Sequence, residues 1–387
     1  MKRAVASITA AAAIVAAATA ALSSDTTLRS ALHDYRVVTF VENLVQPWSI
    51  AFLPNGDALI TERPGRLRIV RNGKLLPQPV EGVPKVLQTS QGGLLEVMPH
   101  PSFASNRLLY LSYSKAGATE AQATTTLVRG RFENDRLTNV QQLFEATAQG
   151  RNHFSGKIAF DKNGYLFLSA GDRQVAPEGN LEAHPAQLLS NHQGKIIRLH
   201  DDGRVPADNP FVKQAGAKPE IWSYGHRNVQ GLLVHPATGE LWADEHGPQG
   251  GDELNRIQAG RNYGWPVIGY GVNYTTGLAI HAGTHKEGME QPVNVWVPSI
   301  GISGLMVYTG DKFPQWRGNI FAGGMNGQQL SRLTLDGQRV VSQELLVQRM
   351  GRIRDVRQGP DGYIYLVTDD RDGKPTPVYR LEPVERK

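Results

Sequence analysis

Short runs of apolar residues, separated by tight polar turns, recur along this chain. Each copy consists of an apolar strand, a turn built on Pro or Asp, and a second apolar strand, and several of the turns contain Asn-Gly or Asp-Gly. These dipeptides favour the positive φ angles of hairpin turns, so each copy predicts a β-hairpin. The copies are residues 49–61, 95–113, 158–168, 232–242, 306–323 and 356–366.

Six copies, roughly 45–80 residues apart, indicate one supersecondary unit per copy. Such a unit cannot bury both faces of its sheet alone, and stacking around an axis buries them. We therefore predict an all-β fold, a six-bladed β-propeller that forms a single domain over residues 25–387. The segment from Tyr35 to Val41 alternates like a strand, and we expect it to pair with the last blade and close the ring. Long insertions near 171–220 and 245–300 argue against an evenly stranded β-sandwich, and we expect function to lie there.

The N-terminus has the pattern of a secretion signal. Lys2 and Arg3 precede an uncharged, alanine-rich run from Ala4 to Leu22, and small residues that suit a cleavage site follow. Alanine is only weakly apolar, so a signal peptide over residues 1–24 fits better than a permanent membrane span. We expect a periplasmic or secreted protein without stable membrane association.

Composition narrows the class of function. The chain has 41 basic and 36 acidic residues and a formal net charge of +5, without a run of Lys and Arg interleaved with aromatic residues. A nucleic-acid partner is therefore not expected. The sequence contains no cysteine, which excludes disulfides and thiolate metal sites.

The segment from Tyr224 to Gly231 combines a cation, an amide and turn-forming glycines in one short loop. The planar guanidinium of Arg227 matches carboxylate or carbonyl oxygens, and the amide of Asn228 lies next to it in the chain. An isolated Arg-Asn pair can equally belong to a solvated turn. Three other polar clusters in the chain favour the interpretation as a binding loop.

The first of these clusters contains a candidate base. His153 lies in a glycine-flanked loop just before the third repeat, and its imidazole is suited to accept a hydroxyl proton near pH 7. Asp172 ends the strand that follows, and a hairpin brings strand end and strand start together. We expect Asp172 to orient the His153 ring, although a turn-capping carboxylate is the alternative.

The second cluster is an acidic loop over residues 244–255. Its carboxylates, together with glycines and a proline that expose backbone carbonyls, suit a hard cation such as calcium, although the spacing of an EF-hand is absent. A solvated acidic loop is the alternative. The following segment, residues 262–266, is expected to fold back over such a site.

The third cluster leads into the sixth repeat. Arg352 and Arg354 are expected on one face of a strand, where two guanidiniums repel each other unless an anion lies between them. Gln91 adds an amide at the start of the second repeat. All these clusters flank repeats at equivalent places, so in a propeller they are expected to converge on one mouth of the axial channel.

These motifs resemble those of the soluble quinoprotein aldose sugar dehydrogenases, which use pyrroloquinoline quinone (PQQ) and calcium and fold as six-bladed propellers. The resemblance covers nearly all of the chain after residue 24. The segments that carry it are 46–54, the loop of Gln91, 152–156, 193–196, 221–231, 245–248, 251–253, 262–266 and 352–355.

The resemblance implies a role for each candidate residue. It implies that His153 is the general base that takes the proton of the anomeric hydroxyl while hydride passes to the quinone, with Asp172 beside it. Arg227 would hold the quinone edge and stabilise developing negative charge. The other residues implied to bind the cofactor are Gln91, Asn228, His246, Asn326, Arg352 and Arg354. Those implied to bind calcium are Gly247 and Pro248 at the cofactor, and Glu253 with the carbonyl of Tyr263 at a second, structural ion.

The sequence departs from the family pattern in two places. Many relatives have a lysine where this chain has Asn326, which removes one cation from the implied cofactor site. Residues 296–304 align less closely with the aromatic wall of the glucose-specific members, and the loops there are short, which predicts an open site with broad aldose specificity. The expected reaction converts an aldose to its lactone and passes electrons to an external acceptor. A non-catalytic propeller that binds sugar or protein, and a calcium-dependent lactonase, are the alternative hypotheses.

Overall fold

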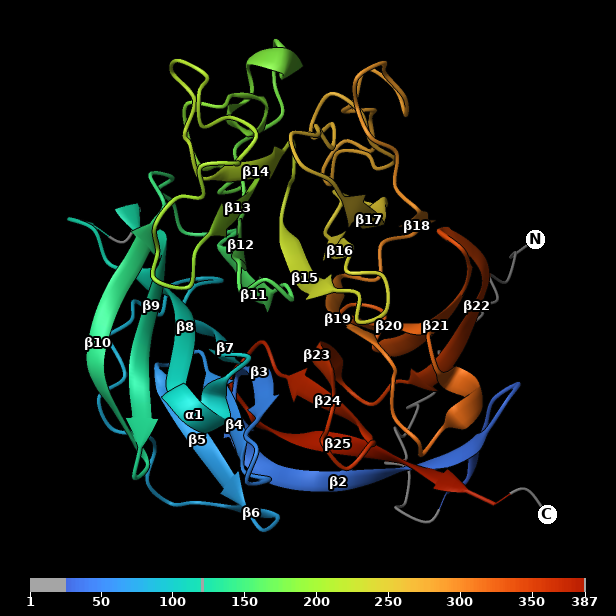
Figure 1. The fold of residues 1–387 in the computed structure, drawn as a ribbon. Coiled ribbons are helices and arrows are strands. Elements are labelled where there is room, and N and C mark those ends of the chain that lie inside the picture. Colours follow the sequence, from blue (N-terminus) through green and yellow to red (C-terminus); the bar gives the residue numbers. More distant parts are fainter. Residues whose placement is uncertain (1–25, 120–121, 386–387) are drawn as a thin grey trace, which may run out of the picture.

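The computed structural model describes residues 26–119 and 122–385, so the predicted signal peptide over residues 1–24 lies outside the described residues. Six small antiparallel sheets are arranged in a ring (Figure 1). The protein is therefore a six-bladed β-propeller, as the repeat count predicts. No helix in the described ranges has the length and hydropathy that a bilayer crossing requires.

Blades 1 to 3 contain four strands each. Blade 1 is built from β3 (Pro47–Phe52), β4 (Ala58–Glu62), β5 (Arg66–Arg71) and β6 (Lys74–Leu75). Blade 2 is built from β7 (Leu94–Pro99), β8 (Leu108–Lys115), β9 (Thr124–Glu133) and β10 (Arg136–Glu145). Blade 3 is built from β11 (Ser155–Phe160), β12 (Leu166–Ala170), β13 (Lys195–Leu199) and β14 (Ile221–Tyr224).

Blades 4 and 5 repeat this plan, and blade 6 draws strands from both ends of the chain. Blade 4 is built from β15 (Val229–Val234), β16 (Leu241–Glu245), β17 (Asp252–Ile257) and β18 (Asn294–Trp296). Blade 5 is built from β19 (Ile302–Val307), β20 (Ile320–Gly324), β21 (Gln329–Asp336) and β22 (Arg339–Gln348). Blade 6 is built from β23 (Arg352–Gln358), β24 (Ile364–Asp369), β25 (Pro375–Val384), β2 (Asp34–Val45) and β1 (Leu28–Arg29).

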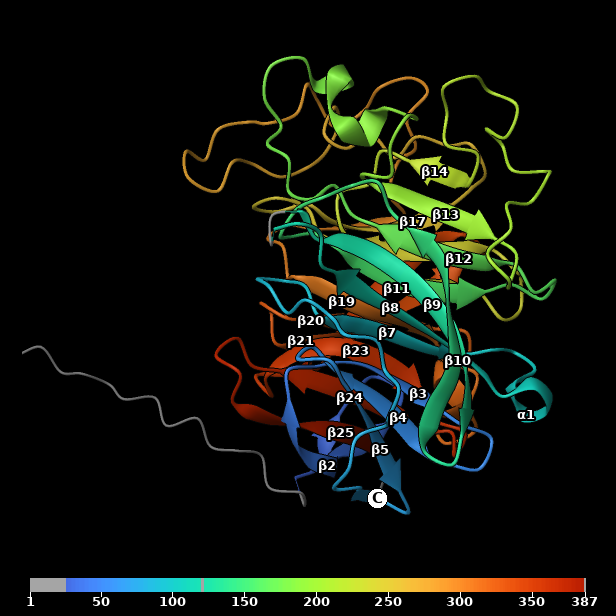
Figure 2. The same cartoon turned by 90° about the vertical axis from the view of Figure 1, so that its left-hand side faces the viewer.

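Helical structure in the described residues is confined to short turns. They are α1 (Phe103–Asn106) and the 3-10 turns Leu181–Ala183, Pro185–Gln187 and Pro314–Trp316. Figure 2 shows long loops that extend beyond the strands of blades 3 and 4. These loops contain the two predicted insertions.

Each predicted hairpin forms the two innermost strands of one blade. The turns depend on glycine where the backbone enters the left-handed region, as at Gly164 with φ 83° and Gly362 with φ 80°. The innermost strands β3, β7, β11, β15, β19 and β23 contact one another in this order around the axis, and β23 contacts β3. All six therefore begin at the same end of the axis.

The ring closes through the N-terminal strand. β2 pairs with β25 over almost its whole length, from Asp34 opposite Val384 to Val45 opposite Pro375. The closure predicted from the alternation of residues 35–41 is confirmed. Strands from the two ends of the chain thereby complete one sheet.

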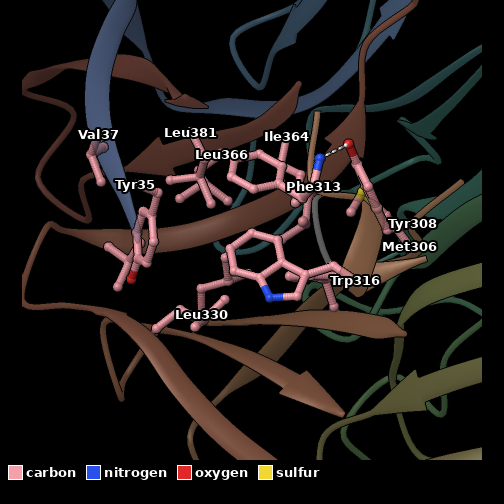
Figure 3. Packing of buried hydrophobic residues seen from close by; sticks show 14 of the residues in the cluster. Tyr35, Val37, Met306, Tyr308, Phe313, Trp316, Leu330, Ile364, Leu366 and Leu381 are labelled. Atoms are coloured by element: carbon pink, nitrogen blue, oxygen red, sulfur yellow. Dashed lines mark hydrogen bonds between the residues drawn. The ribbon is translucent and has the colours of Figure 1, made fainter. Parts of the chain in front are cut away.

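Adjacent blades are held together by apolar side chains, most visibly between blades 5 and 6 (Figure 3). Trp316 is fully buried in this cluster and stacks on Phe313 with a ring-centroid distance of 4.3 Å. The Phe313 N–H donates to the hydroxyl of Tyr308 at 3.0 Å, which fixes the turn that carries both rings. Tyr35 from β2 packs edge-on against Trp316, so the ring closure and this core support each other.

Candidate active site

A cavity of about 600 Å³ lies at the end of the axis where the innermost strands begin. The structure brings together most of the predicted site residues on its wall: Gln91, His153, Arg227, Asn228, His246, Gly247, Pro248, Asn326, Arg352 and Arg354. Asp172 does not line the cavity and lies behind His153. Glu253 and Tyr263 line a much smaller neighbouring cavity, whose wall shares Arg227, His246, Gly247 and Pro248 with the larger one.

The innermost hairpins share a feature that directs side chains toward this cavity. Each has a register shift near the start of its first strand, at 47/49, 94/97, 155/158, 229/231, 303/305 and 353/355. A β-bulge bends the strand and re-aims its side chains, and bulges are common beside active sites. Among the residues at these shifts, Trp48, Leu95, Gln230 and Arg354 line the cavity.

His153 is held rigidly in its loop. Its φ of 46° lies in the left-handed region, which costs a non-glycine residue roughly 1–3 kcal/mol and persists only where the surroundings impose it. The His153 N–H donates to Oε1 of Gln91 at 3.0 Å, and the His153 carbonyl accepts from the guanidinium of Arg173. Arg173 is itself buried and lies over the ring of Phe154. These contacts fix the backbone of the loop from which the imidazole projects.

The His153 ring is hydrogen-bonded to Asp172, with Nδ1 and Oδ1 2.6 Å apart. Burial lowers the pKa of His153, Asp172 partly opposes that shift, and Arg227 adds to it. Burial by itself would raise the pKa of Asp172, but His153 and then Arg227 outweigh it and hold that pKa below its usual value. The pair is thus a neutral imidazole beside a carboxylate near pH 7. Because Asp172 occupies Nδ1, Nε2 is the ring nitrogen left for a substrate.

Trp265 connects this pair to Arg227. Its Nε1–H donates to Oδ2 of Asp172 at 2.8 Å, and the Arg227 guanidinium lies 5.1 Å from the centroid of its ring. Gln187 lies in the first insertion and Trp265 in the second. Nε2 of Gln187 donates to the carbonyl of Trp265 at 2.7 Å. The two insertions therefore meet behind the candidate base.

Arg227 is anchored by its own backbone and by neighbouring carbonyls. Its N–H donates to Oε2 of Glu245 at 2.7 Å, and Glu245 also accepts from His226 at 2.9 Å. Nη1 of Arg227 donates to the carbonyl of Gly247 at 2.8 Å. The loop therefore presents a fixed guanidinium to the cavity, next to the Gly247 carbonyl, which the family resemblance implies as a calcium ligand.

The pair Arg352 and Arg354 requires a correction to the sequence analysis. The anion between the two guanidiniums is Asp369 of the same chain, which accepts from Arg352 at 2.9 Å and from Arg354 at 3.0 Å. Asp369 was missed because it lies at the end of β24, beyond the hairpin motif, directly opposite Arg352 in the sheet. The two arginines still line the cavity, with one of their two charges balanced.

The donor set of the cavity fits a flat ligand that carries several carboxylates, as PQQ does. Two buried atoms, Nε of Arg227 and Nε2 of His246, have no hydrogen-bond partner among the described residues. The wall carries more cations than anions. Its guanidiniums are those of Arg63, Arg227, Arg352, Arg354 and Arg371, and its carboxylates are those of Asp252 and Asp369. Only Arg227 among these arginines is buried, but guanidiniums that share one cavity repel one another, so a bound anion would relieve the excess of positive charge.

The smaller cavity fits a hard cation. Glu253 is hydrogen-bonded to Asn255 at 3.1 Å, and burial, reinforced by Glu245, raises its pKa. Glu245 is buried and Glu253 is half-buried, and a cation with oxygen ligands stabilises two such carboxylates that repel each other. No group of three or more His, Cys, Asp or Glu side chains suited to a metal occurs in the described ranges. Backbone carbonyls would therefore have to complete both calcium sites: those of Gly247 and Pro248 at the ion beside the cofactor, and that of Tyr263 at the second ion.

Several residues at the site were missed or only partly read from the sequence. Segment 262–266 folds back over the acidic loop as expected, but the contact of Trp265 with Asp172 was not foreseen. Tyr274, with 63 % of its surface exposed, lines the cavity from the second insertion, and its hydroxyl lies 3.4 Å from the carbonyl of Gly247. Arg371 lines it from the loop between β24 and β25. Neither position stands in a motif or a repeat, so the sequence offered no signal for them.

Fold and site together define a six-bladed propeller with a basic cavity at one end of its axis and a histidine–aspartate pair on its wall. The chain belongs to the glucose/sorbosone dehydrogenase family, whose family model matches residues 44–380. The resemblance stated from the motifs is thereby confirmed.

Relatives in this family include aldose sugar dehydrogenases. The aldose sugar dehydrogenase YliI of Escherichia coli is 43 % identical over 340 residues, which cover 86 % of this chain and 90 % of the relative. The crystal structure of the apo-form of the soluble aldose sugar dehydrogenase from Escherichia coli superposes with a TM-score of 0.84 at 40 % identity, covering 90 % of this chain and 100 % of that one. The PQQ-bound aldose sugar dehydrogenase of Streptomyces coelicolor superposes with a TM-score of 0.74 at 27 % identity, covering 90 % and 98 %.

Proposed function

We propose that this protein is a PQQ- and calcium-dependent dehydrogenase that oxidises the anomeric carbon of aldoses to lactones. The observation that carries the proposal is the His153–Asp172 pair on the wall of a cavity whose cationic lining fits a polycarboxylate. The PQQ-bound form of a relative supports the choice of cofactor. A base beside a bound hydride acceptor is what oxidation of a hydroxyl requires.

In this proposal His153, Asp172 and Arg227 act directly on the reacting groups. Nε2 of His153 accepts the proton of the anomeric hydroxyl, and Asp172 stabilises the imidazolium that results. Arg227 supplies positive charge where negative charge develops, in a position fixed by Glu245 and the Gly247 carbonyl. When bound, PQQ supplies the hydride acceptor and calcium supplies Lewis acidity.

The remaining side chains hold the ligand. Arg352 and Arg354 bind carboxylates of the cofactor, Asn228 and Gln91 contribute amides, and His246 offers its unpartnered Nε2. Asn326 belongs to the same cofactor site and lies at the rim of the cavity. Gly247 and Pro248 contribute carbonyls to the calcium ion beside the cofactor, while Glu253 and Tyr263 hold a second ion that stabilises the loop.

The same proposal covers the range of substrates and the location of the protein in the cell. Tyr274 is the aromatic side chain that stands most exposed at the cavity, and the site accepts several aldoses. The chain from residue 25 onward acts as one domain, in the periplasm or outside the cell after removal of residues 1–24, and an external acceptor takes the electrons.

Reconstitution tests this function directly. The apo protein is mixed with calcium and PQQ, and dye reduction is followed with a panel of aldoses; turnover that needs both additions is expected. His153→Ala should abolish nearly all of it while the absorbance of bound PQQ is retained. Full activity of His153→Ala would exclude this base, and absence of turnover despite sugar binding would favour a non-catalytic propeller.

A further inference from the structure

The side chain of Asn326 holds two arginines together at the rim of the cavity. Its Oδ1 accepts from Nη1 of Arg352 at 3.0 Å and from Nη2 of Arg371 at 2.7 Å. Arg352 begins β23, whereas Arg371 lies in the loop between β24 and β25. One neutral oxygen therefore tethers cations from two separate segments, and both line the cavity.

This rim carries more positive charge than its own carboxylates balance. Arg352 and Arg354 share Asp369 as their counter-ion. Within the described part of the chain, no carboxylate lies at ion-pair distance from Arg371, and the neighbouring Asp370 uses its carboxylate to accept backbone N–H groups of its own turn. Three guanidiniums thus face one carboxylate. An anionic group on a bound ligand would balance the excess.

We propose that Arg371 binds a carboxylate of the PQQ cofactor and that Asn326 positions it for this contact. This inference rests on the proposed function and adds a binding residue to it. A guanidinium can bind a carboxylate through two parallel N–H donors, which makes the contact directional as well as electrostatic. Arg371 belongs to an exposed loop, so a second acceptor is needed to hold its long side chain over the cavity.

The identity of residue 326 explains why a second segment takes part. An asparagine oxygen accepts hydrogen bonds from guanidiniums, which a lysine ammonium cannot do because it only donates. Asn326 brings no charge of its own to the rim, and Arg371 supplies a cation there from another loop.

Equilibrium binding of PQQ to the apo protein, in the presence of calcium, tests this assignment without relying on turnover. Quenching of tryptophan fluorescence gives the dissociation constant. Arg371→Gln is expected to weaken binding about tenfold, as loss of a partly exposed charge-assisted contact does. Arg349→Gln is the matched control, because Arg349 is an exposed arginine of a nearby turn that does not line the cavity. It should bind as the wild type does.

The positioning role has its own test. Asn326→Ala should also weaken binding, and its effect should be smaller in the Arg371→Gln background than in the wild type, since part of that effect acts through Arg371 and the rest through Arg352. Losses that simply add would overturn the positioning role. Wild-type affinity in Arg371→Gln would overturn the inference while leaving the proposed function intact. A wild-type protein that does not bind PQQ would overturn both.

Discussion

Asp172→Asn is the most informative single change, because it keeps the shape of the side chain and removes its charge. The carboxylate accepts from Nδ1 of His153 at 2.6 Å, from Nε1 of Trp265 at 2.8 Å and from the backbone of Gln174 at 2.8 Å. Asp172 is fully buried, so water cannot replace any of these contacts. An amide in either orientation points an N–H group at another N–H group.

The expected loss follows from what His153 must do. Accepting a proton turns the buried ring into a cation, which Asp172 stabilises and an amide does not. General-base catalysis contributes roughly 10²- to 10⁴-fold, so kcat/KM should fall within that range, or about 3–5 kcal/mol in the barrier. In the catalytic triad of serine proteases, replacing the aspartate beside the histidine by asparagine costs about 10⁴-fold, the upper end of this range.

The pH dependence gives a second, independent readout. Activity needs the neutral imidazole, so kcat/KM should rise with pH through the pKa of His153, which burial holds below its ordinary value. Asp172 raises that pKa, so its removal should move the acid limb to lower pH even as the plateau falls. A lower plateau with the limb displaced upward would contradict this reasoning.

The assay is dye reduction by the reconstituted protein over a range of pH, at saturating PQQ and calcium. Circular dichroism and the absorbance of bound PQQ show whether the variant is folded and loaded. A folded, loaded Asp172→Asn protein with at least one fifth of the wild-type kcat/KM would refute the role assigned to the pair.

Three further changes probe other parts of the structure. Trp265→Phe removes one donor to Asp172 but keeps its charge, so kcat/KM in the same assay should fall only about 3- to 10-fold, or about 0.7–1.4 kcal/mol, the net size of an ordinary hydrogen bond; an effect as large as that of Asp172→Asn would show that Trp265 matters as much as the charge of Asp172. Glu253→Gln should abolish most of the rise in melting temperature that calcium gives the wild type, measured by scanning fluorimetry with and without a chelator; an unchanged rise would place the ion elsewhere. Trp316→Ala should lower the free energy of unfolding by about 3–5 kcal/mol in urea titrations, because it empties a fully buried indole site; a loss below 1 kcal/mol would show that the interface between blades 5 and 6 tolerates the cavity.

The fold was predictable because its determinants are local. A hairpin is specified by a few apolar residues and a turn such as the one at Gly164, and six copies specify the number of blades. The closing strand was also predictable, since the alternation of residues 35–41 needs a partner sheet. The outer strands carry weaker signals because they are shorter or more exposed, as in β6 and β10.

The site was predictable only where its residues stand in motifs at the starts of the inner strands. His153, Arg227 and Arg352 could be placed on one end of the axis from topology alone. The contacts of Trp265, Asp369 and Arg371 could not, because they depend on how loops and neighbouring strands pack in space. The cationic rim was correctly located, but its internal counter-ion was missed for this reason.

The pairing of β2 with β25 has a consequence for how the protein is made. Arg36 and Glu382, joined by an ion pair of 2.7 Å, are 346 residues apart, so β2 lacks its partner strand until residues 375–384 have been synthesised. Loss of either end should leave an exposed strand edge on an open ring, which is a template for association with other chains. The toroid is thus sealed only after residues 375–384 have emerged, and shorter translation products leave it open.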